Sequence, residues 1–149
     1  MSKYNKAILS FAAMSLFAAA LASPVFAART PAPKDAAVYI IWPHDGTVIH
    51  GGKLWVRMGL RGAGVAPKGA DMPNVGHHHL IVDADLPPFD QPIPSDRHYL
   101  HFGGGQTEVR LEGLTPGKHT LQLLMGDNNH VPHDPPLYSK KITIIVPPN

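Results

Sequence analysis

The chain has 149 residues, a formal net charge of +2 at neutral pH and no cysteine. The absence of cysteine excludes disulfide bonds, thiolate zinc sites and a blue-copper centre, which needs a cysteine ligand. The basic residues form no cluster, so no nucleic-acid partner is expected. Histidine is unusually frequent, and all ten histidines follow the first 27 residues.

Residues 1–27 have the order of a cleavable secretory signal. Lys3 and Lys6 precede an apolar run over 7–22, and Val25-Phe26-Ala27 places suitable residues before the predicted cleavage site. The run of about 16 residues is shorter than the roughly 20 needed to span a bilayer, so no membrane span is expected after cleavage. We therefore predict that the mature chain is periplasmic or secreted. Without the two lysines of the signal, the mature chain has equal numbers of basic (Lys and Arg) and acidic (Asp and Glu) residues.

A single all-β domain is predicted for residues 36–149, after a flexible, Pro- and Ala-rich leader over 28–35. Short apolar or alternating runs are separated by Gly, Pro, Asn and Asp clusters about every 8–15 residues. The predicted strands are 37–42, 54–60, 77–84, 97–102, 107–111, 119–125 and 137–146. Seven strands at this spacing favour an immunoglobulin-like antiparallel β-sandwich, and a small closed barrel is the alternative.

Three histidine clusters lie in or beside these strands. They are His77-His78-His79 in the third strand, His98 and His101 in the fourth, and His130 with His133 between the last two strands. In a sandwich of this order, the connections that carry the three clusters gather at one end. We therefore expect the clusters to meet there, and the other end to carry His44, His50 and His119.

Side-chain alternation divides the triple histidine between two faces of its strand. If the apolar residues that follow it point into the core, His78 does too, whereas His77 and His79 point outward, about 7 Å apart. By the same argument, an inward Phe102 directs His101 outward.

These clusters predict a metal site. Neutral imidazole binds zinc, copper and nickel, and a mononuclear site needs three or four such ligands. We expect a copper or zinc ion to be held for scavenging, buffering or delivery. The predicted ligands are His77, His79, His101, His130 and His133, with Asp127 and Asp134 orienting them. Met125 at the end of its strand is expected in the core.

Other interpretations stay open at the level of sequence. The imidazoles could form a polar network with Asp127, Asp134 and Asn128, or act as a pH-sensing cluster. The same loops could instead bind a periplasmic protein or a cell-envelope partner without any metal. An enzyme is less favoured, because there is no convincing general base and no His-x-Glu or His-Glu-x-x-His signature.

Three motifs also carry a resemblance to a known family. They are Gly76-His77-His78-His79-Leu80, Leu100-His101-Phe102-Gly103-Gly104-Gly105-Gln106-Thr107 and Gly126-Asp127-Asn128-Asn129-His130-Val131-Pro132-His133. Over roughly residues 49–146 the chain resembles the bacterial exported family DUF4399, a domain of unknown function. The resemblance implies a small exported domain of the same kind, and it implies no activity.

Overall fold

The computed structural model describes residues 29–148. The predicted signal peptide, residues 1–27, lies outside the described residues. The elements are β1 (Ala37–Trp42), the 3-10 turn η1 (His50–Gly52), β2 (Leu54–Arg61), β3 (Gly64–Val65), β4 (Val75–Val82), β5 (Tyr99–His101), β6 (Glu108–Leu111), β7 (Gly117–Gly126) and β8 (Ile142–Val146). Within the described part, no helix has the length and apolar character to cross a membrane.

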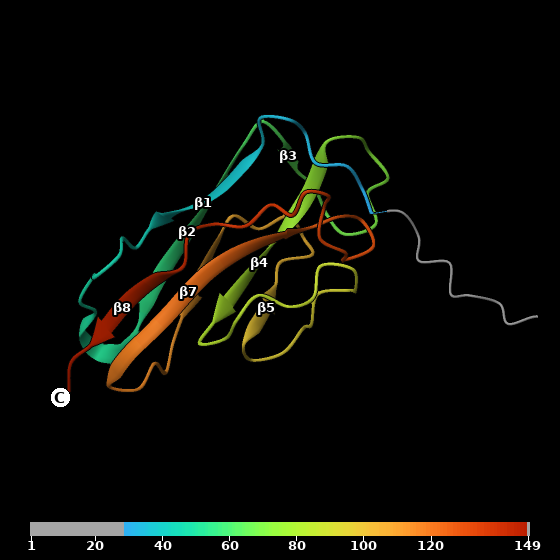
Figure 1. Ribbon diagram of the computed structural model, residues 1–149. Helices are drawn as coiled ribbons and strands as arrows, with labels where there is room; N and C mark the ends of the chain where they lie inside the picture. The colour runs from blue at the N-terminus through green and yellow to red at the C-terminus, as the bar shows by residue number, and fades with distance from the viewer. Residues whose placement is uncertain (1–28, 149) are drawn as a thin grey trace, which may run out of the picture.

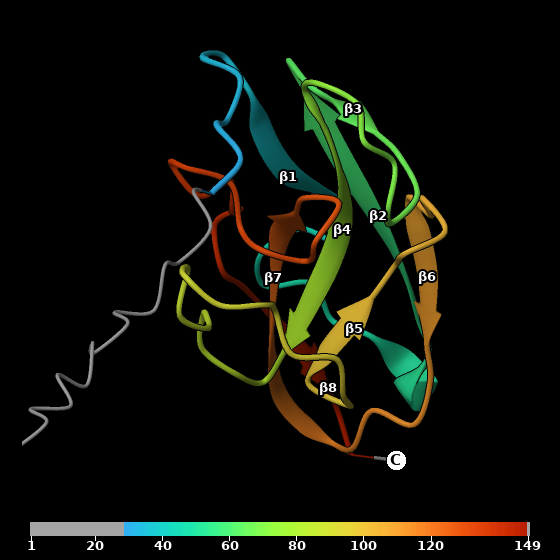
Figure 2. The same cartoon turned by 90° about the vertical axis from the view of Figure 1, so that its right-hand side faces the viewer.

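The strands form two sheets that pack face to face (Figures 1 and 2). One sheet has the order β1-β2-β6, and the other has the order β3-β4-β7-β8, with β5 also paired to β4. If the seven longer strands are lettered A to G in chain order, β1, β2 and β6 are A, B and E. They face β4, β7 and β8, which are C, F and G, as in the immunoglobulin fold. The predicted all-β, immunoglobulin-like sandwich is therefore confirmed.

Three strands differ clearly from the prediction, and one of them, β5, covers only Tyr99–His101 of the predicted 97–102. β3 was not predicted, because its two residues pair in parallel with the start of β4 and have no pattern of their own. The last strand is shorter than predicted, since β8 begins only at Ile142. Before it, the Ser139 hydroxyl accepts a hydrogen bond from the Leu123 amide at 2.8 Å. That amide is therefore not left for a regular backbone ladder.

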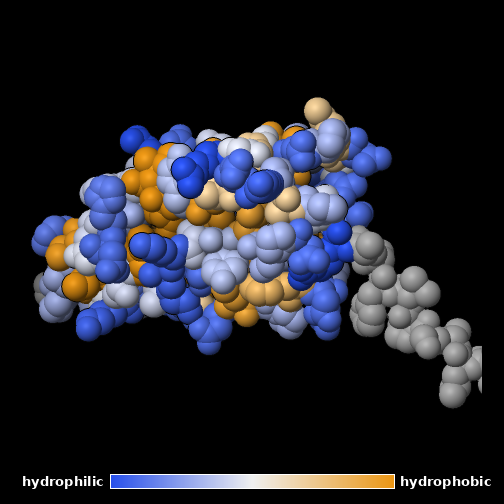
Figure 3. Space-filling model, turned by 45° about the horizontal axis from the view of Figure 1, so that its top comes forward, coloured by the Kyte–Doolittle hydropathy of each residue, from blue (hydrophilic) through white to orange (hydrophobic). Residues whose placement is uncertain are grey.

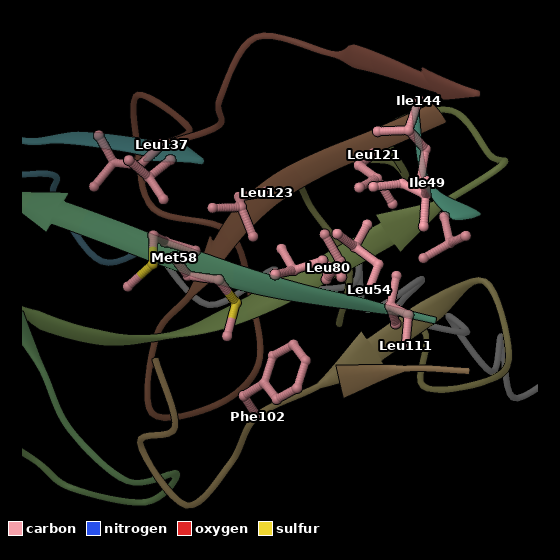
Figure 4. Packing of buried hydrophobic residues seen from close by; sticks show 14 of the residues in the cluster. Ile49, Leu54, Met58, Leu80, Phe102, Leu111, Leu121, Leu123, Leu137 and Ile144 are labelled. Carbon is pink, nitrogen blue, oxygen red and sulfur yellow. The ribbon is translucent and has the colours of Figure 1, made fainter. Parts of the chain in front are cut away.

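The main core lies between the two sheets. Leu80 of β4 and Leu123 of β7 are fully buried there, facing Met58 of β2 (Figure 4). Met125 belongs to the same cluster, as the alternation along β7 requires. This packing directs the methionine away from the face that carries His77 and His79.

A second, smaller core covers the outer face of β4 and β7. Ile81 and Leu124 point to that face and pack against Ile93, which comes from the long connection before β5. Figure 2 shows the segments 83–98 and 127–136 on the side of β4 and β7 that faces away from β2 and β6. Because both its faces are covered, every residue of β4 after the first is buried. Elsewhere, on the face in Figure 3, hydrophilic side chains are interspersed with smaller hydrophobic areas.

The predicted flexible leader makes specific contacts from residue 29 onward. The Ala32 amide donates to the carbonyl of Asp134, and the Asp134 amide donates to the carbonyl of Thr30, each at 2.9 Å. The Thr30 hydroxyl donates to the Asp127 carboxylate at 2.6 Å, and Arg29 forms an ion pair with Asp134. This segment is thus bonded to the connection between β7 and β8, about 100 residues away, which no local sequence pattern could indicate.

Candidate metal centre

Four imidazoles converge on one point on the outer side of β4. One ring nitrogen each from His77, His79, His101 and His130 lies within 4.8 Å of the others. Zinc–nitrogen bonds of about 2.0–2.1 Å allow two ligands of one ion to be at most about 4.2 Å apart. That is the separation of two opposite ligands, and ligands at tetrahedral angles are only about 3.4 Å apart. The widest pair of nitrogens must therefore close by roughly 0.6–1.4 Å before one ion can bind all four. The group is slightly wider than a mononuclear metal site.

Strand pairing positions three of the four rings. His77 and His79 share the outer face of β4, and their ring centroids are 4.8 Å apart. β5 pairs antiparallel with β4 in a register that places His101 directly opposite His79. The rings of this cross-strand pair stack at 5.0 Å, because directly opposed side chains lie about 5 Å apart on a sheet.

The fourth ring comes from the connection after β7. The buried Asp127 accepts hydrogen bonds from the backbone amides of Asn129 at 2.8 Å and Val131 at 2.9 Å. This tight turn places His130 at a φ of 66°, with its ring centroid 4.1 Å from that of His101. Asp127 therefore acts on the site through the backbone of the turn, and none of its side-chain hydrogen bonds goes to an imidazole.

The converging nitrogens are buried and have no hydrogen-bond partner. His77 is 1% exposed and His79 is 0% exposed. Within residues 29–148, the Nε2 atoms of all four histidines lack a partner: His77, His79, His101 and His130. Leaving one such buried polar atom unpaired costs about 1–3 kcal/mol. Each of the four clustered histidines therefore has a buried ring nitrogen available to a ligand that accepts nitrogen lone pairs.

The surroundings keep these imidazoles neutral. Burial, followed by repulsion from the neighbouring histidines, lowers the pKa of His79 to about 2 and that of His77 to about 4. Burial is also the largest cause of the lowered pKa of His101 and of His130. Neutral imidazole, with one lone pair available, is the form that binds metals. At neutral pH the group therefore needs no deprotonation to act as a ligand set.

Two glycines that were not among the predicted site residues make room for the rings. A Cβ atom on Gly103 would lie 2.5 Å from Cε1 of His101, and one on Gly126 would lie 2.8 Å from Cε1 of His79. Glycine runs usually indicate turns that need positive φ, but of the three glycines 103–105 only Gly105, with φ 79°, has one. The repeated occurrence of glycine beside histidine in the motifs was the available signal.

Three of the predicted site residues lie outside the group of four: Asp127, whose turn is described above, His133 and Asp134. His133 is 2% exposed, and its Nε2 lies 3.2 Å from the carbonyl oxygen of Val75. Asp134 has an exposed carboxylate that pairs with Arg29 and makes no hydrogen bond to an imidazole among the described residues. The structure therefore brings together four of the five predicted ligands, and their role in metal binding stays a prediction.

The remaining histidines are separate from this group. His78 points into the main core, as the alternation of side chains along β4 predicts, and is 0% exposed. His119 lies near the start of β7, at the opposite end from Gly126. Its Nδ1 is 2.6 Å from Asp83 Oδ2. Burial opposes protonation of His119, but hydrogen bonds to Asp83 and Thr115 outweigh it and raise its pKa.

Comparison with solved structures finds related folds at low similarity. The solution structure of the PKD domain (329–428) from human KIAA0319 has 13% identity and a TM-score of 0.42, covering 80% of this chain and 86% of its own. The fibronectin(III)-like modules of Clostridium thermocellum CbhA have 15% identity and a TM-score of 0.35, covering 73% and 92% respectively. No curated protein matches the chain. The profile of one family matches residues 56–147, which is more than half of the sequence, and the chain therefore belongs to the family described as "Domain of unknown function (DUF4399)".

Proposed function

We propose that this protein is an exported metal-binding module that holds one Cu(II) or Zn(II) ion through His77, His79, His101 and His130. The observation that carries the proposal is the convergence of four imidazoles, with one ring nitrogen of each within 4.8 Å of the others and a buried, unpartnered Nε2 on every ring. A polar network would give these nitrogens hydrogen-bond partners. The two carboxylates among the candidate partners are otherwise engaged, since Asp127 bonds the backbone of its own turn and Asp134 pairs with Arg29. Metal scavenging, buffering or delivery is the role that fits such a site.

The ligand set favours copper and zinc over other ions. Four neutral nitrogens suit borderline metals, whereas Ca(II) and Mg(II) require oxygen ligands. Zn(II) accepts four ligands as a tetrahedron, and Cu(II) accepts them in a tetragonal arrangement. The Irving–Williams order places Cu(II) above Zn(II) for a nitrogen site, so Cu(II) should bind more tightly.

Titration calorimetry on the untagged mature chain tests this function. One Cu(II) or Zn(II) should bind per chain, and His101→Ala should weaken binding by roughly 100-fold or more, because removing a ligand costs more than the 10–100-fold typical of groups that only orient one. His44→Ala is the matched control and should bind as the unchanged protein does, since His44 is exposed and outside the group. Equal losses in the two variants, or no binding above that of a flexible histidine peptide, would leave the loops as a partner-binding surface instead.

Two measurements on the native protein address export and metal identity. Mass spectrometry should find an N-terminus at Ala28 or Arg29, because the signal is expected to be cleaved after Ala27 or Ala28. Elemental analysis of the same material should find copper or zinc near one equivalent. A chain that retains Met1 in its mature pool would contradict export without bearing on metal binding.

A further inference from the structure

We propose that the outer face of the β1-β2-β6 sheet binds an acidic polysaccharide, a chain of sugars that carries carboxylates. The metal centre lies on the outer side of the other sheet, so the two sites are on opposite sides of the sandwich. The inference therefore does not depend on a bound metal. This surface is called the aromatic face below, and it consists of Tyr39, Trp42, Trp55, Arg57, Arg61, Glu108 and Arg110.

Strand pairing gathers three exposed aromatic side chains on this face. Trp42 lies opposite Arg57, and Trp55 lies opposite Arg110. Directly opposed residues point to the same side of a sheet. The exposed fractions are 39% for Trp42, 50% for Trp55 and 44% for Tyr39. Both tryptophans of the chain are therefore on one face, with much of their apolar area left in contact with solvent.

Tyr39 lies across the sheet and does not project from it. It is paired with Gly59 of β2, and three of its ring carbons lie within 2.9 Å of the place that a Cβ on Gly59 would take. The glycine thus lets the aromatic ring rest against the backbone of the neighbouring strand. A ring held in this way offers a surface for stacking, and the C–H groups of a sugar ring form a matching apolar face.

The charge of the aromatic face favours an acidic partner. All charged residues of the three strands are exposed on it, and they are three arginines and one glutamate: Arg57, Arg61, Arg110 and Glu108. Lys53 before β2 and Glu112 after β6 cancel each other. Because basic and acidic residues are equal in number from residue 29 onward, the rest of the mature chain has an acidic excess. Arginine binds carboxylates through two parallel hydrogen bonds, which makes a carboxylate the best-matched group.

The arginines of this face are available to a ligand. Arg57 pairs with Glu108 at 3.6 Å, and Arg110 pairs with Glu112 at 3.2 Å. All four side chains are about half exposed or more, and such surface pairs contribute only about 0–1 kcal/mol. Among residues 29–148, Arg61 makes no ion pair. A carboxylate can therefore bind Arg61 directly and exchange with the glutamates at the other two arginines.

The size of the face favours a chain-like ligand over a protein. The eight residues of β2 span about 26 Å, and three strands about 4.8 Å apart span about 14 Å. The resulting area, of the order of 400 Å², is about half of the roughly 800 Å² that each partner buries in a stable protein complex. An extended sugar chain needs only such a strip. Glu108 would be repelled by the phosphates of an anionic membrane, whereas it can accept hydrogen bonds from sugar hydroxyls.

Tryptophan fluorescence tests the proposal without a label, because both tryptophans lie on the aromatic face. Alginate oligosaccharides, which are linear chains of uronic acids, are added to the metal-free mature protein in the presence of a chelator. They should change the fluorescence in a saturable manner, and added salt should weaken the binding. Dextran oligosaccharides of the same length carry no charge and should bind much more weakly.

Two substitutions test the two kinds of contact. Trp55→Ala should weaken alginate binding roughly 3- to 10-fold, the effect of one aromatic stacking contact, and the remaining Trp42 still reports binding. Arg110→Gln should weaken it by a similar factor, and Arg110→Lys should restore only part of the loss, because lysine lacks the planar fork. Met72→Ala is the matched control for the apolar change, since Met72 is 61% exposed and outside the face.

Three outcomes would overturn the proposal. They are the absence of a saturable response to alginate, an equal response to dextran, and unchanged affinity in both Trp55→Ala and Arg110→Gln. A response to phosphatidylglycerol vesicles without one to alginate would identify a membrane surface and would also overturn it. Because the titration uses metal-free protein, its failure leaves the proposed metal binding untouched, and failure of metal binding leaves this result untouched.

Discussion

At the scale of single residues, the alternation of side chains along β4 separates the core histidine from the proposed metal ligands. His78 faces the main core, whereas His77 and His79 face the other way toward His101. Alternation predicted this division from the sequence, because side chains of a strand must point to opposite faces. It did not predict that the outer face is also buried. The covering segments 83–98 and 127–136 have no periodic pattern, and their position depends on tertiary packing.

The contact between Gly103 and the imidazole of His101 can be tested by comparing alanine substitutions at two neighbouring glycines. Gly103→Ala should displace the His101 ring, because its new Cβ would lie 2.5 Å from that ring. We expect metal affinity to fall roughly 10-fold or more, since ligands displaced by about 1 Å lose their productive geometry. Calorimetry with Zn(II) measures this.

Gly104→Ala is the control for this substitution, because its Cβ would meet only the flexible end of Gln106, at 3.1 Å. Its affinity should stay close to that of the unchanged protein. If both alanine variants bind Zn(II) equally well, the packing of Gly103 has no part in holding the ligand.

At the scale of elements, the turn over residues 127–131 is the part of the site that sequence spacing could not specify. From the sequence, Asp127 and Asp134 were equally good candidates for orienting the ligands, since each is a carboxylate near a histidine. The structure distinguishes them by burial, because Asp127 is 4% exposed and bonds backbone amides, whereas the side chain of Asp134 is 64% exposed. Which backbone groups a carboxylate meets is decided by the turn itself and by the incoming Thr30.

Asp127→Ala and Asp134→Ala should therefore differ in stability. The first removes three hydrogen bonds to a buried charge, and we expect a loss of about 2–4 kcal/mol in the free energy of unfolding. It should also weaken metal binding, because His130 depends on the turn. The second breaks a largely exposed ion pair, which is worth about 0–1 kcal/mol. Urea denaturation of the metal-free proteins measures both values, and equal losses would show that Asp127 does not hold the turn.

At the scale of the whole molecule, the spacing of apolar runs and turn residues was sufficient to predict a sandwich. The longest strands, β2, β4 and β7, are largely buried on at least one face, so their pattern is visible in the sequence. The pairing of β5 with β4, which sets His101 opposite His79, was not predictable, because three residues carry too little pattern to choose a sheet. The assembled fold nevertheless joins the three motifs at one end, as the order of the strands requires.

The burial of neutral histidines should make the metal-free protein lose stability as pH falls. In the unfolded chain the imidazoles take up protons near pH 6.5, whereas the folded chain does so only near the lowered pKa values, about 4 for His77 and about 2 for His79. Between about pH 6.5 and 4 the unfolded state therefore binds more protons, and protons favour unfolding. His119, whose pKa is raised, contributes in the opposite sense and stabilises the fold below about pH 6.5.

Melting temperatures followed by circular dichroism from about pH 7.5 to 4.5 test this linkage. The metal-free protein should melt at lower temperature as pH falls, and His79→Leu should reduce this dependence because it removes one buried base. His119→Gln should make the decline steeper. Near neutral pH, metal at about 100 times its dissociation constant should add about 2.7 kcal/mol, a gain that His79→Leu should largely abolish. A melting temperature that is independent of pH over this range would mean that the four imidazoles are not held neutral by the fold.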